Sequence, residues 1–493
     1  MGATQAGTAS FFEKHPSPSS PQSLLFGRTG WAVSTVGFGC YRVEEEDPKH
    51  RAALRLALGS GCNLIDTSTN YTNGSSERLV GQVLQELFDT HEWNRDEIVV
   101  VTKVGYVQGE NLELARIRES EGKAFPEMVK YGDGIWHCIS PEFLDDQITR
   151  SLSRLAIDQI DLLLLHNPEY FLKAEGDHAE YYRRIKSALE HLETEIRRGR
   201  IQKYGISSNT FVDPKESPEY TSLETILEFA GPGFAAIQFP MNLFEPGAQF
   251  EPNNSGKSIC ELAASRGLGT LVNRPLNAFT RERMIRLADF PVSGETDAEE
   301  DLKNAFIPAL ELESRYPARI QVPAKNVAWA HLLRDNLDRV NELDLWRQVL
   351  RYQIQPVLAD SYSRLLSLGG EAQAWAEEHP VRIEALFSAF TRFLEHRHSI
   401  ESNRIRDILE RACPEIKRSH QTLSQASLRI YRSLPGVQVV LVGMRQPEYV
   451  RDALQLLPRL SPEEATDAFD AIPSSRWKSR NERFEPTPRL PLL

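Results

Sequence analysis

Short apolar runs alternate along the chain with longer segments whose apolar residues recur every three or four positions. The run DLLLLH at 161–166 is almost continuously apolar, which is typical of a strand buried on both faces of a parallel sheet. Comparable runs predict strands at residues 33–39, 63–66, 98–103, 161–166, 203–207, 235–240, 269–272 and 437–443. Segments with helical spacing, such as 75–87, 140–155 and 181–199, lie between most of them.

This alternation predicts an α/β fold. Eight parallel strands with intervening helices close a (β/α)8 TIM barrel, which needs about 250 residues. The chain has 493 residues, so further segments must be added to the barrel. We predict a mobile tail at 1–22, a barrel made of 23–280 and 416–460, a helical insertion at 281–415, and a C-terminal tail at 461–493.

Two connections are longer than a barrel requires. One holds 36 residues between Lys103 and Ser140, and the other follows the seventh predicted strand. Because both leave the end of a strand, both begin on the face where barrel enzymes carry their active site. We expect 281–415 to cap the mouth of that site, with an oligomer contact remote from it as the alternative. Its amphipathic helices can bury one another's apolar stripes, as the spacing of these residues indicates: Ile383, Leu386, Phe387, Phe390, Phe393 and Leu394.

The composition narrows the class of partner. A formal net charge of -12 argues against binding to nucleic acid or to an anionic membrane, because both need clustered positive charge. No apolar run approaches the roughly 20 residues that span a bilayer, and the first residues lack the apolar core of a signal peptide. The five scattered cysteines indicate reduced thiols and a cytoplasmic location: Cys40, Cys62, Cys138, Cys260 and Cys413.

Four chemically active residues follow successive predicted strands. Asp66, Lys103 and His166 each end a strand, and Tyr71 follows Asp66 by five positions. Taken singly, the aspartate is more often a cap or turn residue and the tyrosine a half-buried aromatic. A lysine that closes a buried strand is harder to explain structurally, because an unpaired buried ammonium is costly. Together the four residues predict a site of proton chemistry at the carboxyl ends of the strands.

The segments around these residues resemble the aldo-keto reductase superfamily, in the form of a bacterial-type member with a large helical insertion. The matching pieces, in chain order, are GFGCY, DTSTNYTNGSSERLVG, TK at 102–103, DLLLLHNPE, GISSN, QFPMNLFE, NRPLNA and VLVGMRQPEYVRDAL. The resemblance implies an NADP-dependent oxidoreductase that reduces an aldehyde or ketone to an alcohol, or runs the reverse reaction. Its substrate would be a small molecule, and its oligomeric state is left open.

In that reaction Tyr71 would be the general acid or base, since a proton must reach the carbonyl oxygen as negative charge develops there. A phenol has an ordinary pKa of about 10, and the Lys103 ammonium is expected to lower it. Asp66 would pair with Lys103 and keep it charged. His166 would donate a hydrogen bond to the carbonyl oxygen and orient it.

The resemblance also implies a cofactor site for NADP(H), with NAD(H) as an alternative. Ser207 and Ser208 fall where the nicotinamide carboxamide is held, although Ser208 replaces the usual Asn. Asn273, followed by Arg274, occupies the position of the usual stacking aromatic residue. Arg445 falls where the family has a basic residue that binds the adenosine 2'-phosphate. Arginine suits this role, since a guanidinium binds phosphate through two hydrogen bonds. The remaining implied cofactor positions are Cys40, Tyr41, Asp66, Gln238, Leu276, Gly443 near the pyrophosphate, Tyr449, and Asp452 near adenine.

Two other functions stay open on the same barrel. A regulatory protein could keep the cofactor and use the insertion to hold a partner, and a Schiff-base lyase could use Lys103 as its nucleophile. The histidines of HRH at 396–398 are two positions apart on a predicted helix, so their rings point away from each other. We therefore predict no metal site.

Overall fold

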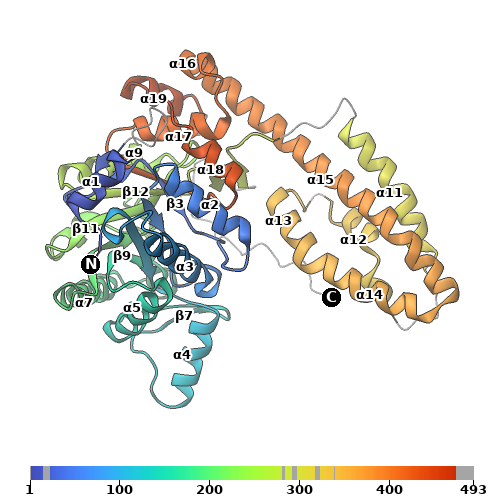
Figure 1. The fold of residues 1–493 in the computed structure, drawn as a ribbon, viewed down its shortest axis with the longest axis horizontal. Coiled ribbons are helices and arrows are strands. Elements are labelled where there is room, and N and C mark those ends of the chain that lie inside the picture. Colours follow the sequence, from blue (N-terminus) through green and yellow to red (C-terminus); the bar gives the residue numbers. More distant parts are fainter. Residues whose placement is uncertain are drawn as a thin grey trace. The chain divides into compact units, whose positions relative to one another are not determined.

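The computed structural model of the chain describes residues 2–14, 23–279, 284–290, 297–316, 322–337 and 339–472. Eight parallel strands close a barrel in the order β10-β11-β12-β15-β3-β4-β5-β9 (Figure 1). The predicted (β/α)8 barrel and its eight strand positions are therefore confirmed. The barrel strands are β3 (Val36–Gly39), β4 (Leu64–Asp66), β5 (Val99–Val104), β9 (Ile160–His166), β10 (Ile201–Ser207), β11 (Phe234–Pro240), β12 (Gly269–Asn273) and β15 (Val439–Val442).

The strand register brings the ends of neighbouring strands to one level. Gly39 pairs with Asp66 across β3 and β4, and His166 pairs with Ser207 across β9 and β10. Every residue of β5, β9 and β11 is buried, as expected for strands covered on one side by helices and on the other by the barrel interior. Polar side chains at these strand ends therefore meet at one face of the barrel.

Helices surround the barrel and follow the predicted spacing. The predicted helices at 75–87, 140–155 and 181–199 are α3 (Ser75–Asp89), α5 (Pro141–Leu155) and α7 (His178–Arg197). The other helices of this part are α2 (Pro48–Gly59), α6 (Tyr170–Glu175), α8 (Leu223–Leu227), α9 (Gly247–Phe250), α10 (Ile259–Ser265), α16 (Pro414–Arg418), α17 (Leu423–Ser433) and α18 (Pro447–Leu454), with 3-10 turns η1 (Tyr71–Gly74) and η2 (Arg95–Glu97).

The long connection after β5 forms a small structure of its own. It contains β6 (Tyr106–Val107), α4 (Glu110–Ser120), β7 (Val129–Gly132) and β8 (Ile135–His137). The three strands make a sheet in the order β6-β8-β7, and both pairings are antiparallel. Since β6 starts two residues after β5 ends, this sheet holds Tyr106 next to the strand ends.

The region after β12 is a separate helical unit. The chain divides into one compact unit that reaches Ala278 and resumes at Leu409, and another that runs from Phe279 to Ile408. The long helix α15 (Gly370–Ala412) passes through the boundary. The other elements here are β13 (Asn277–Phe279), β14 (Met284–Arg286), α11 (Ala298–Ser314), η3 (Ala324–Asn326), α12 (Trp329–Asp335), α13 (Leu343–Val349), η4 (Leu350–Ile354) and α14 (Gln355–Leu368).

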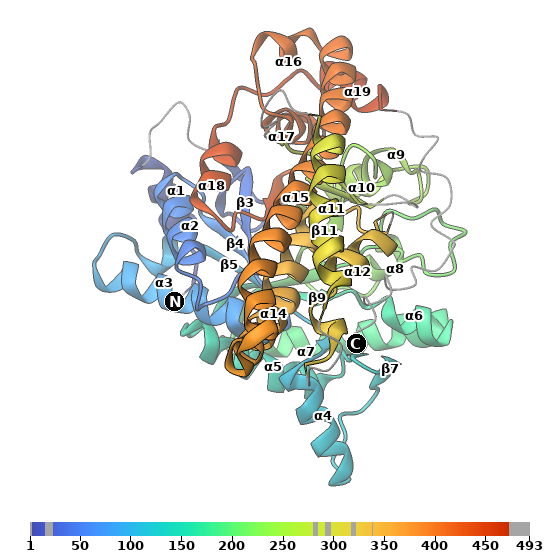
Figure 2. The ribbon, with the colours of Figure 1, turned by 90° about the vertical axis from the view of Figure 1, so that its right-hand side faces the viewer.

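The apolar stripes of these helices bury one another, as the sequence predicted. Ile383, Leu386, Phe387, Phe390 and Leu394 lie in one buried cluster with residues of α11, α12, α13 and α14, and Phe393 packs against that cluster. Figures 1 and 2 show α11 lying beside α15. Nothing in these contacts tests whether the insertion caps the active site, so the cap stays a prediction.

One buried acid joins the helices of this unit. Glu313 of α11 accepts hydrogen bonds from the backbone N–H groups of Ala330 and His331 at 2.7 and 3.1 Å. Its other contacts are with the ring of His331 at 2.7 Å and with the ring of His379 at 3.3 Å. Glu313 thereby caps the start of α12 and links α11 to α15.

The N-terminal residues 2–14 are not the mobile tail that the sequence predicted. Residues Gln5–Glu13 form helix α1, and its Phe11 is fully buried against Trp93, with ring centroids 4.7 Å apart. The backbone N–H of Ala3 donates to Asp161 Oδ1 at 2.6 Å. Burial of one aromatic ring and one hydrogen bond to a buried acid therefore hold this segment on the barrel.

The strands β1 (Ser23–Leu25) and β2 (Ala32–Ser34) follow as an antiparallel pair. Residues 15–22 lie outside the described residues.

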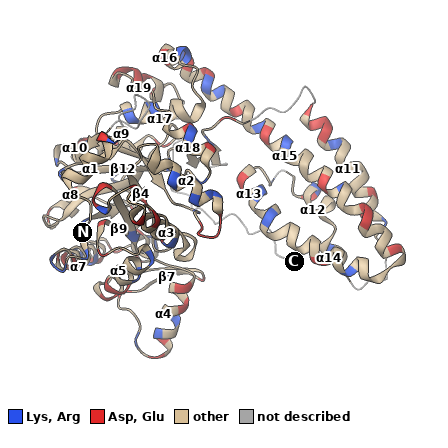
Figure 3. Cartoon of the chain, in the orientation of Figure 1, with Lys and Arg blue, Asp and Glu red and all other residues tan. Residues whose placement is uncertain are grey.

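The first part of the predicted C-terminal tail at 461–493 is a helix. Helix α19 (Pro462–Asp470) has a capping box at Ser461 and Glu464, and its Phe469 is buried next to Tyr431. The rest of the predicted tail, from 473 onward, lies outside the described residues. Among the described helices, none is long and apolar enough to cross a membrane. All five cysteines are buried and unpaired. Figure 3 shows acidic and basic residues interspersed along α11 and α15.

Candidate active site

A buried ion pair lies at the centre of the site. Lys103, at the end of β5, is fully buried, and its Nζ lies 2.6 Å from Asp66 Oδ2. The ammonium also donates to the backbone oxygen of Thr67 at 2.8 Å and to the Tyr71 hydroxyl at 3.3 Å. Burial alone would lower the pKa of Lys103, but the charge of Asp66 and the contact with Tyr71 outweigh it and raise that pKa. The ammonium therefore stays charged beside the phenol.

A tight turn presents Tyr71 to this ion pair. Tyr71 opens the 3-10 turn η1, in which Thr72 has a φ of 44° and Gly74 a φ of 81°. A positive φ is strained for a β-branched residue. The hydroxyl of Thr72 donates to the backbone oxygen of Val43, which stabilises the turn, and a Cβ at Gly74 would lie only 2.9 Å from Arg154.

The Tyr71 phenol is a weaker acid than the sequence predicted. Burial raises the pKa of Tyr71 to about 12, although the Lys103 ammonium acts in the opposite direction. The prediction of a lowered pKa is therefore wrong, because it considered the ammonium but not the burial. A phenol with this pKa stays protonated at neutral pH, so Tyr71 holds a proton that it can donate.

His166 lies beside the phenol as a neutral ring. The ring centroids of Tyr71 and His166 are 6.0 Å apart at an angle of 79°. Burial lowers the pKa of His166 well below its ordinary value, and the nearby Lys103 and His137 lower it further. Its Nδ1 lies 3.1 Å from the hydroxyl of Ser68. The structure thus brings all four predicted catalytic residues to one face of the barrel.

An amide network extends from the ion pair towards β10 and β12. Gln238 at the end of β11 donates to Asp66 Oδ1 at 2.9 Å. Its oxygen accepts from Ser207 Oγ at 3.2 Å and from Asn273 Nδ2 at 3.3 Å. The Oδ1 of Asn273 is buried and has no hydrogen-bond partner in the described part of the chain. A buried acceptor without a partner fits a site for the amide of a nicotinamide.

Two predicted cofactor residues have other partners. The hydroxyl of Ser208 is fully buried and lies 3.2 Å from Thr210 Oγ1 and 3.4 Å from Thr221 Oγ1, so it does not join the Gln238 network. Arg274, with a φ of 54°, lies 3.3 Å from the buried carboxylate of Glu245. Their predicted roles as carboxamide and cofactor contacts stay predictions.

The remaining predicted cofactor residues come from both ends of the barrel sequence. Gly443 follows β15 and has no atom within 4 Å of the position a Cβ would take, so a ligand can approach its backbone closely. Asp452 of α18 accepts a hydrogen bond from Thr422 at 2.8 Å and another from Ser424, which ties α18 to the start of α17. Cys40 is fully buried, Tyr41 and Tyr449 are exposed, and Leu276 and Arg445 are half-buried.

Sequence reasoning missed an aromatic group next to His166. The ring of Tyr106 in β6 lies 4.6 Å from the His166 ring, and its hydroxyl accepts a hydrogen bond from Asn167 Nδ2 at 2.8 Å. Tyr170 and His137 pack against Tyr106 at 5.1 and 5.9 Å. The sequence signal for Tyr106 was its position three residues after Lys103. His137 returns from β8, which no local pattern indicates.

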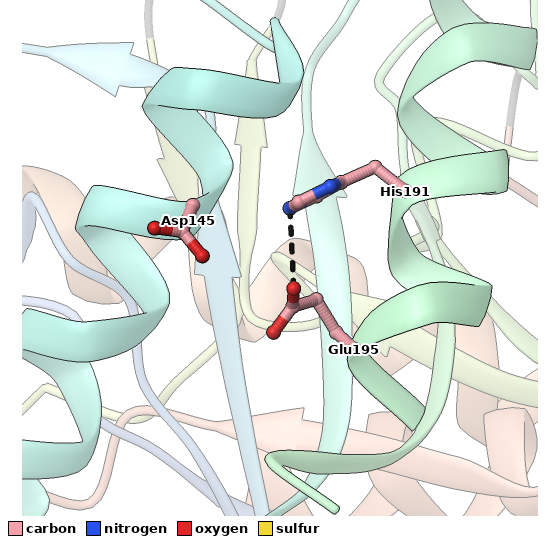
Figure 4. A group of neighbouring side chains, drawn as sticks. All are labelled: Asp145, His191 and Glu195. Atoms are coloured by element: carbon pink, nitrogen blue, oxygen red, sulfur yellow. Dashed lines mark ion pairs between the residues drawn. The ribbon is translucent and has the colours of Figure 1, made fainter. Parts of the chain in front are cut away.

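One group of side chains has the composition of a metal site. Asp145, His191 and Glu195 come from α5 and α7 and lie together on the outside of the barrel (Figure 4). Both carboxylates are already paired with Arg198, at 3.3 and 2.9 Å, and with Arg200. Two guanidinium groups supply the positive charge that a cation would bring, so this cluster is an ion-pair network between two helices.

Comparison with known proteins agrees with this fold. A model of the "Aldo/keto reductase family" matches residues 35–472, so the chain belongs to the aldo/keto reductase family. Among solved structures, the aldo-keto reductase AKR11C1 from Bacillus halodurans in its holo form covers 94% of this chain and 99% of its own, with a TM-score of 0.50 and 16% identity. At that identity the likeness concerns the fold alone.

Two curated relatives share parts of the sequence. The NADH-specific methylglyoxal reductase of Escherichia coli is 37% identical over 154 residues, which cover 29% of this chain and 41% of that protein. The D-threo-aldose 1-dehydrogenase of a Pseudomonas species is 30% identical over 187 residues, which cover 36% of this chain and 51% of that protein. The chain thus spans about half or less of the length of these relatives.

Proposed function

We propose that the protein is an NADP(H)-dependent oxidoreductase that reduces an aldehyde or ketone to an alcohol, or runs the reverse reaction, with Tyr71 as general acid or base. The observation that carries the proposal is the contact of Tyr71 with the buried Lys103–Asp66 pair. A buried ammonium 3.3 Å from a phenol oxygen stabilises negative charge on that oxygen. Proton transfer from the phenol is therefore favoured once a strongly basic oxygen forms nearby.

A carbonyl oxygen would lie between Tyr71 and His166. The phenol donates the proton as charge develops on this oxygen, and the neutral ring of His166 donates a second hydrogen bond that orients it. Asp66 keeps Lys103 charged and in place. The rings of Tyr71, Tyr106 and His166 lie next to one another here, and such an aromatic surface would exclude water from the reacting groups.

The nicotinamide cofactor, when bound, supplies the hydride. Ser207, Gln238 and the unpartnered acceptor of Asn273 would hold its amide. Gly443 and Arg445 would hold its phosphates. Arg445 favours NADPH over NADH, since a guanidinium binds the additional phosphate. The similarity to a relative named as NADH-specific makes this choice worth measuring directly.

The test uses full-length protein, NADPH and a panel of aldehydes and ketones, with loss of NADPH absorbance as the signal. Tyr71→Phe should lower turnover by about 100-fold or more, the size of a lost general acid, and leave NADPH binding unchanged. Tyr352→Phe is the matched control, because Tyr352 is an exposed tyrosine of the helical unit. Wild-type turnover in Tyr71→Phe would remove Tyr71 from the mechanism. Trapping of substrate on Lys103 by borohydride would favour the lyase instead.

A further inference from the structure

Ser68 connects the ring of His166 to a chain of hydrogen bonds that ends near the surface. Ser68 is fully buried, and its Oγ lies 3.1 Å from His166 Nδ1, 2.7 Å from Asn70 Oδ1 and 3.3 Å from the backbone oxygen of Lys103. Asn70 Nδ2 in turn lies 3.0 Å from Gln108 Oε1. Gln108, Asn70, Ser68 and His166 thus form one continuous relay. Ser68 and Asn70 come from the segment after β4, Gln108 from the connection after β5, and His166 from the end of β9.

The direction of this relay decides what His166 can do. A serine hydroxyl has one proton to donate. If Ser68 donates it to Asn70, Ser68 can only accept from His166 Nδ1–H, and the ring's Nε2 is then an acceptor. If Ser68 donates to Nδ1, Nε2 carries the ring proton and is a donor. Because burial keeps the ring neutral, only one ring nitrogen is protonated at a time.

In the structure Ser68 Oγ donates to Asn70 Oδ1, and Asn70 Nδ2 donates to Gln108 Oε1. The reverse direction needs both amides turned by half a turn, which leaves the shape of each side chain nearly unchanged. The amide oxygen and nitrogen of Asn70 have nearly the same shape, so half a turn of the amide exchanges donor and acceptor. The same holds for Gln108. In one arrangement Gln108 donates to Asn70 and Asn70 donates to Ser68. In the other arrangement Ser68 donates to Asn70 and Asn70 donates to Gln108. Among the described residues, Ser68 is the hydrogen-bond partner of the His166 ring, since His137 donates to the backbone oxygen of His166 instead.

We propose that Ser68, Asn70 and Gln108 are positioning residues that fix the ring tautomer of His166, with the proton on Nε2 during carbonyl reduction. In this state Gln108 donates to Asn70, Asn70 donates to Ser68, and Ser68 donates to His166 Nδ1. The inference rests on the proposed function, because a carbonyl oxygen accepts hydrogen bonds and needs Nε2–H facing it. The opposite state turns the lone pair of Nε2 towards that oxygen and repels it.

Two substitutions at Asn70 separate this idea from a structural role. A carboxylate only accepts hydrogen bonds, so Asn70→Asp forces Ser68 to donate away from His166. We expect it to lower kcat for carbonyl reduction about tenfold or more, with an unchanged KM for NADPH. Asn70→Ala leaves Ser68 two acceptors, His166 Nδ1 at 3.1 Å and the backbone oxygen of Lys103 at 3.3 Å. Donation to the nearer ring nitrogen should retain kcat within about threefold. Asn70→Ala removes more of the side chain than Asn70→Asp changes, yet it is expected to lower kcat less.

The added charge needs its own control. Asn73 lies three positions further on, and its Oδ1 accepts from the backbone N–H of Glu110 at 2.9 Å. Asn73→Asp keeps this acceptor and adds the same charge outside the relay, so it should leave kcat unchanged. Ser68→Ala should lower kcat as Asn70→Asp does. Ser68→Thr keeps the hydroxyl and should therefore retain the wild-type kcat. Equal loss of kcat in Asn73→Asp and Asn70→Asp would overturn the proposal.

The tautomer itself can be read by NMR of full-length protein carrying ¹⁵N-histidine and saturated with NADP+. The signal of His166 is assigned by its loss in His166→Asn. We expect protonated Nε2 in wild type and Asn70→Ala, and protonated Nδ1 in Asn70→Asp. The same tautomer in wild type and Asn70→Asp would overturn the relay. Because this spectrum needs no turnover, a wild type that reduces no carbonyl would overturn the proposed function alone.

Discussion

Replacement of Lys103 by methionine tests the buried ion pair most directly, because it removes the ammonium and keeps the length of the side chain. Lys103 is fully buried and has three polar contacts, with Asp66, Thr67 and Tyr71. In Lys103→Met the Asp66 carboxylate remains buried, with Gln238 as its other partner. Removal of one member of a buried pair costs about 3–5 kcal/mol. We expect a loss of this size in the free energy of unfolding, measured by urea titration.

The double variant Asp66→Asn with Lys103→Met separates stability from catalysis. It removes both charges, and neutral replacement of a buried pair is often close to neutral for stability. We therefore expect most of the lost stability to return, while turnover stays at least about 100-fold below wild type because Tyr71 lacks its ammonium. Recovery of turnover together with stability would refute a catalytic role for Lys103. Wild-type stability of Lys103→Met would refute the buried pair.

The pH dependence of this effect has a definite sign. The folded-state pKa of Lys103 is raised, because Asp66 and Tyr71 together outweigh the lowering by burial. A raised lysine pKa contributes stability that is fully present below the unfolded value of about 10.4, and this stability is lost as pH rises through the folded value. The contribution of Lys103 should therefore persist through neutral pH and be lost only in strong alkali. Burial raises the pKa of the Asp66 carboxyl even beside Lys103, and loss of the ammonium raises it further. The difference in stability between wild type and Lys103→Met should accordingly also shrink towards acid pH, as Asp66 of the variant takes up a proton.

Three further predictions concern the cofactor and the helical unit. Arg445→Ala should weaken NADPH binding, measured by calorimetry, by about 1.5–3 kcal/mol, the range for hydrogen bonds to charged groups. NADH binding should change little, and equal weakening of both would mean that Arg445 has a structural role. Glu313→Ala leaves the buried N–H groups of Ala330 and His331 without their acceptor, at about 1–3 kcal/mol each, so hydrogen exchange should rise across α12 and α15. If the insertion caps the site, replacing 281–415 by a short Gly/Ser linker should change substrate size preference and keep NADPH binding; unchanged kinetics on small and bulky carbonyls would refute the cap.

The barrel could be predicted from the sequence because its strands carry a strong local signal. A strand such as β9 is buried along its whole length, so most of its residues are apolar and do not alternate with polar ones. Helix α1 gave no comparable signal, because its position depends on contacts distant in sequence. Phe11 packs on Trp93, and Ala3 binds Asp161. A short segment whose burial depends on a few distant partners looks like a tail until those partners are placed.

The sequence could predict which of the proposed catalytic residues meet, but not the pKa of Tyr71. Strand ends meet at one face of a barrel, so Asp66, Lys103 and His166 could be placed together from their positions alone. The direction of the shift in the Tyr71 pKa depends on how deeply the phenol is buried. Burial raises this pKa by more than the Lys103 ammonium lowers it. The contact between Ser68 and His166 joins residues 98 positions apart. Its existence follows from the register of β4, β5 and β9, which no local pattern contains.

Gln238 makes the catalytic pair and the predicted carboxamide site parts of one network. Its nitrogen holds Asp66, and its oxygen accepts from Ser207 and Asn273. An amide can donate on one side and accept on the other, whereas a glutamate at this position would repel Asp66. A shift of the groups proposed to hold the cofactor amide would therefore reach the Asp66–Lys103 pair through one side chain. Because Lys103 in turn contacts Tyr71, the position of the proposed proton donor would be coupled to the binding of the cofactor.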